Sequence, residues 1–417
     1  MSASTEKKLR AENRAAGTDK KMLALQEEEK KKKKSKTRWT WGTIGVVILI
    51  IAILFFSSNI FYRSTTALTI GDKSYGPDDV TYHYANQYYN FFSMYGSYAS
   101  LFGLDTSYGI SGLSSQQYAG GEEGYTWKDY FLDAAKSEMA QLKALCDYAG
   151  ANGINLEEAD LEALSTSIED LEASAKENGY ANAKKYLKAA YGDLVTLDTV
   201  EEANAESALA NKAISFYRDS LEYTDEELED YYVSLNGSSD LFTYAYYYIA
   251  AETVESTDAD GSTTTAATEE TLTAAKAGAK AIAAAYEADE NKYDSIEAKL
   301  NAAIASVIAP AEGEDQAVCT YFEDAQGSSL SSSYSSWLME EGREEGDIEV
   351  LENTGNGYYV VVFENRNDNS SDADGDGTID RLAIAKGQMT DTAVTEWIET
   401  LSSNYEAADG FGMKFVG

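Results

Sequence analysis

The stretch whose spacing most resembles a ligand site is the acidic run DADGDGTID at residues 372–380. Its oxygen-bearing side chains, its glycine at the sixth place and its apolar eighth residue match the start of a calcium loop. The twelfth place, where a bidentate carboxylate belongs, is Ala383. The alternative is an Asp/Gly turn that links two strands. The candidate calcium ligands are Asp372, Asp374, Asp376, Thr378 and Asp380.

A second unusual stretch, residues 240–251, reads DLFTYAYYYIAA and places four tyrosines in one apolar run. Alternation predicts a strand with Tyr244, Tyr246 and Tyr248 on one face and Tyr247 on the other. Tyrosine offers an apolar ring and a hydroxyl donor, so the run suits either a buried strand or the border of a binding site.

Other site chemistries find little support. The single histidine, His83, stands in an aromatic segment without a nucleophile, which favours a packed or surface histidine. The two cysteines, Cys146 and Cys319, rule out a Cys-based zinc site by number. They either pair with each other or stay as two small buried residues. The absence of a disulfide-dense framework favours the second alternative.

A membrane anchor is predicted at residues 39–61, which contain no charged residue over 23 positions and carry aromatic residues at both ends. The preceding tail, residues 1–38, has 13 Lys and Arg against 6 Asp and Glu, so it should stay in the cytoplasm and the bulk of the chain outside it. The net charge is +7 for the tail and −38 for the whole chain, so the remaining residues carry a net charge of −45. A surface this acidic repels nucleic acid and excludes it as a partner.

The elements that must position these residues fall into a helical half and a mixed half. A hairpin is predicted at residues 67–76, followed by an aromatic helix at 80–104 whose stripe faces a core or forms a groove for unfolded clients. A glycine-rich loop at 105–124 comes next. Further helices are predicted at residues 127–150, 156–178, 200–221 and 225–232.

The mixed half begins with the tyrosine strand and a loop at 252–268. Periodicity and turn residues then predict three strands and four helices, so the fold class is α+β. The strands are at residues 347–352, 357–363 and 381–385, and the helices at 269–289, 294–308, 334–342 and 390–401.

This order of elements resembles the SurA/PrsA-like extracytoplasmic foldases, which join a helical chaperone domain to a parvulin-type peptidyl-prolyl isomerase domain. The resemblance covers roughly residues 67–385. Its most specific piece is the run WLMEEGREEGD at 337–347 followed by GYYV at 357–360, similar to a parvulin helix, turn and closing strand.

The resemblance implies a peptide site on the first and last strands of the isomerase domain, but the histidines of the family are absent. Their places fall on Tyr247 or Tyr248 in the first strand and on Tyr359 in the closing strand. The glycine-rich loop of the family is also missing. Prolyl isomerisation needs no proton transfer, so the sequence leaves open an active isomerase (rotamase) and an inactive, peptide-binding module. The candidate peptide-binding residues are Tyr247, Tyr248, Tyr359, Phe363 and Trp337.

The expected organisation is therefore a cytoplasmic tail at 1–38, a transmembrane helix at 39–61, a helical chaperone domain at 67–235, a parvulin-like domain at 240–386 and a C-terminal helix and strand at 387–417. The expected function is that of a membrane-anchored chaperone or foldase for unfolded or secreted polypeptides, with no required cofactor. The alternative is a non-catalytic adhesion or scaffold module braced by calcium.

Overall fold

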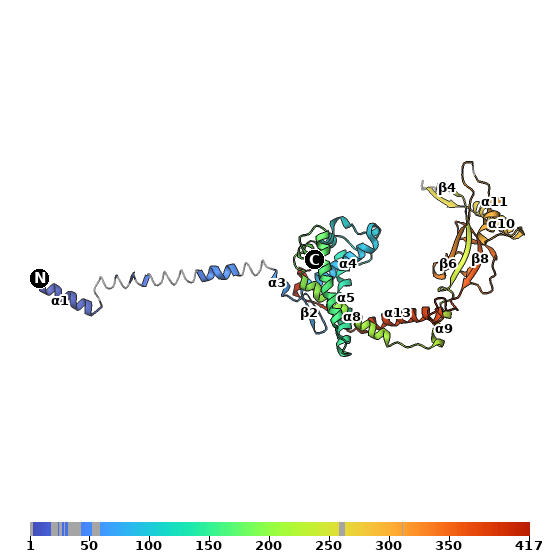
Figure 1. The fold of residues 1–417 in the computed structure, drawn as a ribbon. Coiled ribbons are helices and arrows are strands. Elements are labelled where there is room, and N and C mark those ends of the chain that lie inside the picture. Colours follow the sequence, from blue (N-terminus) through green and yellow to red (C-terminus); the bar gives the residue numbers. More distant parts are fainter. Residues whose placement is uncertain are drawn as a thin grey trace. The chain divides into compact units, whose positions relative to one another are not determined.

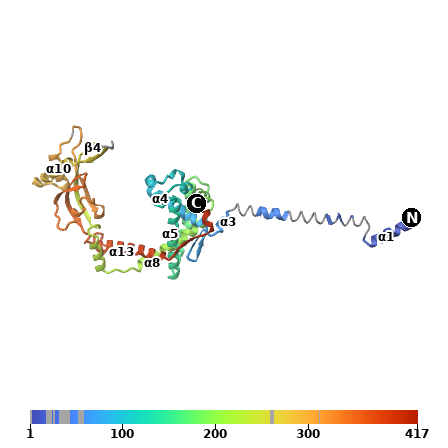
Figure 2. The same cartoon turned by 180° about the vertical axis from the view of Figure 1, so that it is seen from behind.

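A computed structural model describes residues 3–17, 24, 27–28, 30–31, 43–51, 59–257, 263–310 and 312–417 (Figures 1 and 2). The chain forms two compact units. The first contains residues 1–217 and 396–417, and the second contains residues 218–395. Helices and strands occur in both, so the fold is of the mixed α+β class.

The N-terminal region begins with the exposed helix α1 (Ala3–Ala15). In the predicted anchor, residues 43–51 are helical, while 39–42 and 52–58 lie outside the described residues. Within the described ranges, no helix combines the length and apolar character needed to cross a membrane.

The first unit is built on a small sheet with the strand order β2-β1-β9. The predicted hairpin is confirmed as β1 (Leu68–Ile70) and β2 (Lys73–Tyr75), while β9 (Ala407–Asp409) adds a strand from the C-terminal region. Apolar side chains of this sheet pack on Met139 of α5 and on Val416, which ties the chain end into the core.

The aromatic stripe predicted at residues 80–104 divides into a buried half and an exposed half. Helix α4 (Pro77–Tyr95) begins at a proline and buries Tyr84 and Tyr88 against Trp127 and Phe131 of α5. The 3-10 helix η1 (Gly96–Phe102) then continues the chain with several exposed apolar residues. The core interpretation is therefore confirmed from Tyr84 to Phe91, which packs on Trp127 and Phe131, whereas Tyr98 and Phe102 are exposed.

The remaining elements of the first unit are helices joined by short turns. Thr126 caps α5 through a reciprocal pair with Asp129, as Ser/Thr-x-x-Asp/Glu starts require. These elements are α3 (Ile60–Arg63), η2 (Thr106–Tyr108), η3 (Ile110–Ser115), α5 (Trp127–Ala151), α6 (Glu158–Glu177), α7 (Ala183–Tyr191), α8 (Leu197–Asp219) and η5 (Phe411–Phe415).

The second unit is an antiparallel sheet with the strand order β6-β3-β8-β7. The tyrosine strand is β3 (Leu241–Ala250), and it pairs along its whole length with β8 (Gly357–Asn367). The outer strands are β6 (Thr320–Gln326) and β7 (Ile348–Asn353). Side-by-side placement of the tyrosine strand and the closing strand, expected from the sequence, is thus confirmed.

Helices α10 (Glu269–Ala288) and α11 (Ile296–Val307) cover one face of this sheet, next to β8 in Figure 1. The opposite face carries a short covering segment, residues 327–343, with η4 (Gly327–Ser329) and α12 (Ser335–Leu338). The predicted helix at 334–342 is therefore reduced to a single turn. Helix α9 (Asp225–Ser234), predicted at 225–232, begins after the N-cap residue Thr224, which forms a capping box with Glu227.

A buried ionic network fixes the start of the tyrosine strand. Asp240 is 1% exposed, and its two carboxylate oxygens accept hydrogen bonds from Tyr232 at 2.7 Å and from Arg366 Nε at 2.6 Å. Asn369 donates to the Tyr232 hydroxyl at 2.8 Å and to the Ser239 carbonyl at 3.0 Å. The network joins α9, β3 and the end of β8.

Two further predicted segments differ from the structure, and one strand was not predicted. Residues 381–385 are not a strand but the start of one long helix, α13 (Asp380–Ser402), because Leu382, Ala385 and Met389 repeat at helical spacing and pack on α9. The predicted loop at 252–268 contains the hairpin β4 (Thr253–Thr257) and β5 (Thr263–Ala267), whose threonines favour extended backbone. Strand β6 was not predicted.

Candidate functional site

The candidate site lies on the sheet face that α10 and α11 leave uncovered. Tyr248 of β3 stands directly opposite Tyr359 of β8, and their ring centroids are 4.6 Å apart. Asn353 of the neighbouring strand donates to the Tyr248 hydroxyl at 3.3 Å. The sequence allowed either Tyr247 or Tyr248 to take the place of the first histidine of the family that it resembles. Only Tyr248 shares a face with Tyr359.

The structure brings together some of the predicted peptide-binding residues and separates others. Tyr247 points to the opposite face, where it packs against the core beneath α10 and α11. Phe363 is buried in the core beneath the covering segment, together with Leu330 and Leu338. Phe363 is 4% exposed, whereas Tyr247 is partly buried on the face opposite Tyr248 and Tyr359. The candidates that share one accessible face are therefore at its Tyr248 end.

Trp337 lies in the covering segment itself. It packs at the edge of the same core, and the Arg343 guanidinium stacks over its ring at 4.1 Å from the centroid. The covering segment thus closes the half of the face near Phe242, whereas the other half, the open half, keeps Tyr246, Tyr248 and Tyr359 partly exposed. Part of the face expected to bind peptide is therefore filled by the protein's own side chains.

Two further aromatic residues extend the open half, and sequence reasoning missed their role. Tyr246 stacks on Phe322 of β6 at 6.0 Å and meets Tyr359 edge-on at 5.3 Å. Phe322 is 39% exposed at the sheet edge, which makes it a large apolar side chain open to solvent. The alternation of apolar and polar residues in TYFEDAQ could have indicated this strand. Three acidic or amide residues in the same run made the pattern hard to distinguish from a loop.

Tyr334 of the covering segment closes the inner end of the aromatic group. Its ring lies 5.2 Å from that of Tyr359, and its hydroxyl shares a buried 3.2 Å hydrogen bond with Tyr244. Burial raises the pKa of Tyr359 above its ordinary value. The Tyr359 phenol therefore stays protonated at neutral pH and can donate a hydrogen bond to a carbonyl oxygen.

Buried tyrosines make stability sensitive to alkaline pH. Burial raises the pKa of Tyr286, which lies beneath the sheet, to about 12. Because an unfolded tyrosine titrates near pH ~10, the stabilising effect of the neutral phenol is complete below that pH and is lost as the pH rises towards about 12. The free energy of unfolding, measured with urea at a series of pH values, should fall less steeply with pH for Tyr286→Phe than for wild type. The difference between pH ~10 and about 12 should be up to ~1.4 kcal/mol per pH unit. The same dependence on pH for both proteins would contradict this.

The acidic loop leaves β8 and leads directly into α13, so a helix rather than a strand follows it. The carboxylates of Asp372, Asp374 and Asp376 are exposed and lie within 4.8 Å of one another. Both oxygens of Asp372 accept backbone N–H groups, from Gly375 at 2.8 Å and from Gly377 at 3.0 Å. The oxygen set suits a hard cation, whereas Ala383 in the first turn of α13 supplies no carboxylate.

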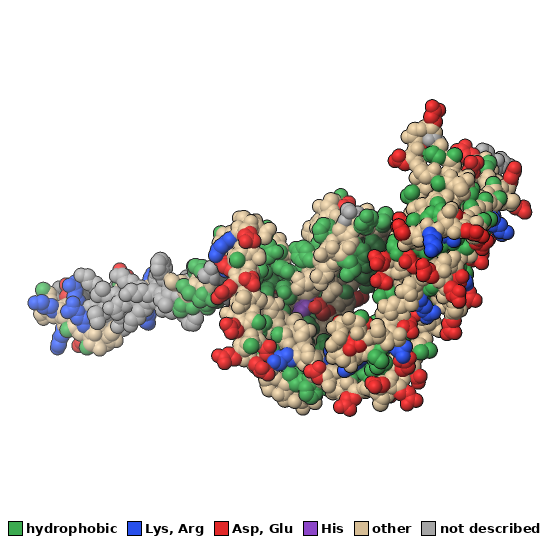
Figure 3. All heavy atoms as spheres, turned by 45° about the vertical axis from the view of Figure 1, so that its right-hand side comes forward, with side chains coloured by type: hydrophobic (Ala, Val, Ile, Leu, Met, Phe, Trp, Pro, Cys, Tyr) green, Lys and Arg blue, Asp and Glu red, His purple; other side chains and the backbone are tan. Residues whose placement is uncertain are grey.

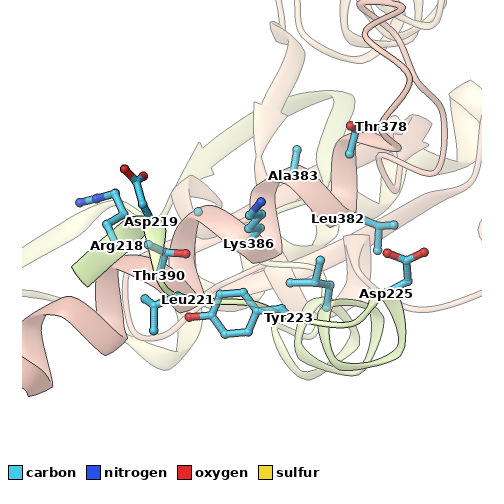
Figure 4. Close-up of a pocket in the computed structure, with 12 residues that line it drawn as sticks. Arg218, Asp219, Leu221, Tyr223, Asp225, Thr378, Leu382, Ala383, Lys386 and Thr390 are labelled. Carbon is cyan, nitrogen blue, oxygen red and sulfur yellow. The ribbon is translucent and has the colours of Figure 1, made fainter. Parts of the chain in front are cut away.

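A cavity of about 670 Å³ lies beside this loop, between the segment before α9 and the first turns of α13 (Figure 4). Figure 4 shows Lys386 in the middle of the view, with Thr378 at one end and Asp219 towards the other. Arg218 is paired with Asp391 at 2.9 Å, and the lining mixes both signs of charge. The lining contains no nucleophile with an adjacent base, so it supports no catalytic assignment.

The remaining reactive side chains have structural roles. His83 is buried, with its Nδ1 3.3 Å from Glu138 Oε2, which confirms a packed histidine. Cys146 and Cys319 are both free. Burial raises the pKa of the Cys319 thiol to about 11, so this cysteine is an unreactive thiol at neutral pH.

No protein-family model matches the chain, and no curated protein matches it. Among solved structures, it is similar to one reported for two SurA-like chaperones of Campylobacter jejuni, at 8% identity and a TM-score of 0.27, over 83% of this chain and 99% of that one. It is also similar to the foldase PrsA of Streptococcus pneumoniae, at 15% identity and a TM-score of 0.23, over 71% of this chain and 96% of that one. PrsA of Bacillus subtilis is similar at 13% identity and a TM-score of 0.21, over 67% of this chain and 88% of that one. These are the two groups that the sequence resembles.

Proposed function

We propose that the chain is an extracytoplasmic protein-folding factor that holds unfolded polypeptide segments on the open half of the β3–β8 face. The supporting observation is the pair Tyr248 and Tyr359, flanked by Tyr246 and the exposed Phe322. Rings on a rigid sheet offer apolar contact area, and their hydroxyls offer donors to the carbonyl oxygens of a bound chain.

Binding, rather than turnover, is the main activity in this proposal. The barrier to rotation about a peptide bond is about 18–20 kcal/mol, and a site lowers it by holding the twisted amide in apolar surroundings with well-placed donors. Tyr248 and Tyr359 supply such donors, but the chain has one histidine only, and it lies buried in the other unit. Any turnover at this face would therefore depend on phenol hydroxyls.

The N-terminal segment serves as the anchor in this proposal. Residues 39–61 carry no charge, and the basic tail before them favours a cytoplasmic N-terminus. The acidic remainder of the chain would then lie outside the membrane, where its clients are secreted polypeptides. Figure 3 shows Lys and Arg gathered at the N-terminal end and Asp and Glu spread over much of the remaining visible face.

The proposal is tested by two assays on the full chain in detergent. The chain should bind a permanently unfolded protein and suppress aggregation of a refolding one, because the open face offers contacts to non-native segments. A protease-coupled assay of prolyl isomerisation, run beside them, should show that Tyr248→Phe with Tyr359→Phe removes whatever turnover exists. A wild-type chain that leaves aggregation unchanged and binds no unfolded protein would refute the proposal.

A second candidate function is that of a non-catalytic surface module braced by calcium. What supports it is the set of three clustered carboxylates in the loop before α13. Calorimetry of the full chain should then detect calcium binding in the range of weak extracellular sites, roughly 10⁻⁴–10⁻³ M, that Asp372→Asn with Asp376→Asn abolishes. Identical heats for wild type and variant would rule out calcium at this loop, whereas client binding in the presence of a chelator should be unchanged.

A further inference from the structure

The first unit contains a cavity of about 470 Å³ that is separate from the sheet site. Helix α4 supplies one wall, η2 and the start of η3 supply another, and residues 188–192 at the end of α7 supply a third. A volume of this size with largely apolar walls is typical of ligand pockets in proteins. Its aromatic lining residues are Tyr84, Tyr88, Tyr89, Tyr108 and Tyr191.

Thr81 lines this tyrosine pocket with a buried hydroxyl that has no hydrogen-bond partner. The residue is only 6% exposed, and an unsatisfied buried hydroxyl costs about 1–3 kcal/mol. The neighbouring Tyr89 hydroxyl, by contrast, donates to the Ala190 carbonyl at 2.6 Å. A ligand that brings an amide or carbonyl group into the pocket would satisfy Thr81, and every peptide unit carries both.

The stretch of chain around the pocket exposes large apolar side chains. Tyr108 lines the pocket and is still 66% exposed. Shortly before it in sequence, Met94, Tyr98 and Leu101 are 67–79% exposed. Exposed apolar groups of this size mark interaction surfaces, and several along one segment suit an elongated ligand better than a compact one.

Charge indicates which polypeptides fit. The chain has no Lys or Arg between residues 74 and 127, and Lys188, the basic residue in the lining of the tyrosine pocket, is paired with Asp193. Hydrogen bonds from Ser107 lower the pKa of the exposed Asp105 carboxyl, which places an ionised group three residues from Tyr108. A second copy of this chain, with −45 outside its tail, would be repelled. A ligand with positive charge is favoured.

A second cavity of about 600 Å³ in the same unit combines aromatic rings with carboxylates. The rings of Tyr118 and Tyr130 stack at 4.6 Å, and Glu122, Glu123 and Asp129 also line the cavity. Aromatic faces next to carboxylates are suited to the ammonium of lysine and the guanidinium of arginine.

We infer that the tyrosine pocket binds segments of non-native polypeptides in which apolar side chains are flanked by Lys or Arg. The inference rests on the proposed function for the kind of ligand, but it uses other residues in the other unit. An apolar side chain would enter between Tyr84 and Tyr108, its peptide unit would meet Thr81, and the flanking cations would lie near the carboxylates.

The test uses the full chain in neutral detergent and two labelled peptides with one apolar, aromatic core, flanked either by lysines or by glutamates. At low salt the lysine-flanked peptide should bind at least about tenfold more tightly. Tyr108→Ala should weaken its binding about fivefold or more, and Thr81→Val about threefold, because each removes a contact to the ligand. Leu161→Ala, which shortens an exposed side chain on α6, is the control and should change nothing.

Equal affinity for the two peptides, or no effect of Tyr108→Ala, would overturn the inference. Because Tyr108 is exposed, its replacement leaves the fold intact, so a silent result there is decisive. If Tyr248→Ala with Tyr359→Ala weakens binding of unfolded protein while Tyr108→Ala does not, this inference fails and the proposed function stands. If the wild-type chain binds neither peptide nor unfolded protein, both fail.

Discussion

Asp240→Ala should destabilise the second unit by about 3–5 kcal/mol, the largest effect we expect from any single substitution. The carboxylate is 1% exposed and neutralises Arg366, while its second oxygen accepts from Tyr232. Its removal leaves a partly buried guanidinium and a buried phenol without the carboxylate that they share. Urea unfolding of the full chain, followed by a probe in the second unit, would show the midpoint of that transition fall.

The control for Asp240 is Asp391→Ala, which removes the partner of Arg218 in an exposed ion pair of the same unit. Surface pairs contribute about 0–1 kcal/mol, so this variant should unfold close to wild type. Similar losses for the two variants would contradict the role of burial. Because Asp240 precedes β3, its loss should also loosen the strand that carries the tyrosines.

Tyr248→Ala with Tyr359→Ala should lower the affinity for an unfolded protein about tenfold or more. The pair stands at the centre of the open half of the face, and the removal of a ring from a desolvated contact costs about 1–3 kcal/mol. Tyr248→Phe with Tyr359→Phe keeps both rings and should bind within about twofold of wild type. Fluorescence anisotropy with a labelled, permanently unfolded protein measures both.

The control for this pair is Tyr293→Ala, which removes a phenol from the α10–α11 connection on the covered side of the sheet. It should leave binding unchanged. Equal affinity of the double alanine variant and wild type, with both folded, would refute the assignment of this face.

The architecture of the second unit was largely readable from the sequence because its signals are local. Alternation in residues 241–250 assigned the two faces of β3, and the structure keeps Tyr246 and Tyr247 on opposite sides. The turn residues between β7 and β8 fixed that hairpin, and the Thr224 box fixed the start of α9. These features depend on neighbours only a few residues apart.

The misassigned elements had ambiguous or weak local signals. The run Arg381–Ala385 is short and apolar, so a strand and a helical turn look alike until the packing of Leu382 and Ala385 on α9 decides. The threonine-rich hairpin and β6 lie in polar sequence, where alternation is hard to distinguish from a loop.

The extent of the site could not be predicted because it depends on contacts distant in sequence. Phe363 is buried because Leu330 and Leu338 of the covering segment pack on it. Nothing in the local pattern of β8 distinguishes Phe363 from Tyr359, which lies at the open end. The register of β3 against β8 likewise decides which tyrosine faces Tyr359.

The most direct test of the central claim is photo-cross-linking from the candidate face. A benzophenone amino acid placed at Tyr248 in the full chain should form an adduct with an unfolded client on irradiation, because that position borders the open half of the sheet. The same group at Lys280, which is exposed on α10 on the covered side, should form none. Adducts of equal yield from both positions, or from Lys280 alone, would show that clients are held elsewhere.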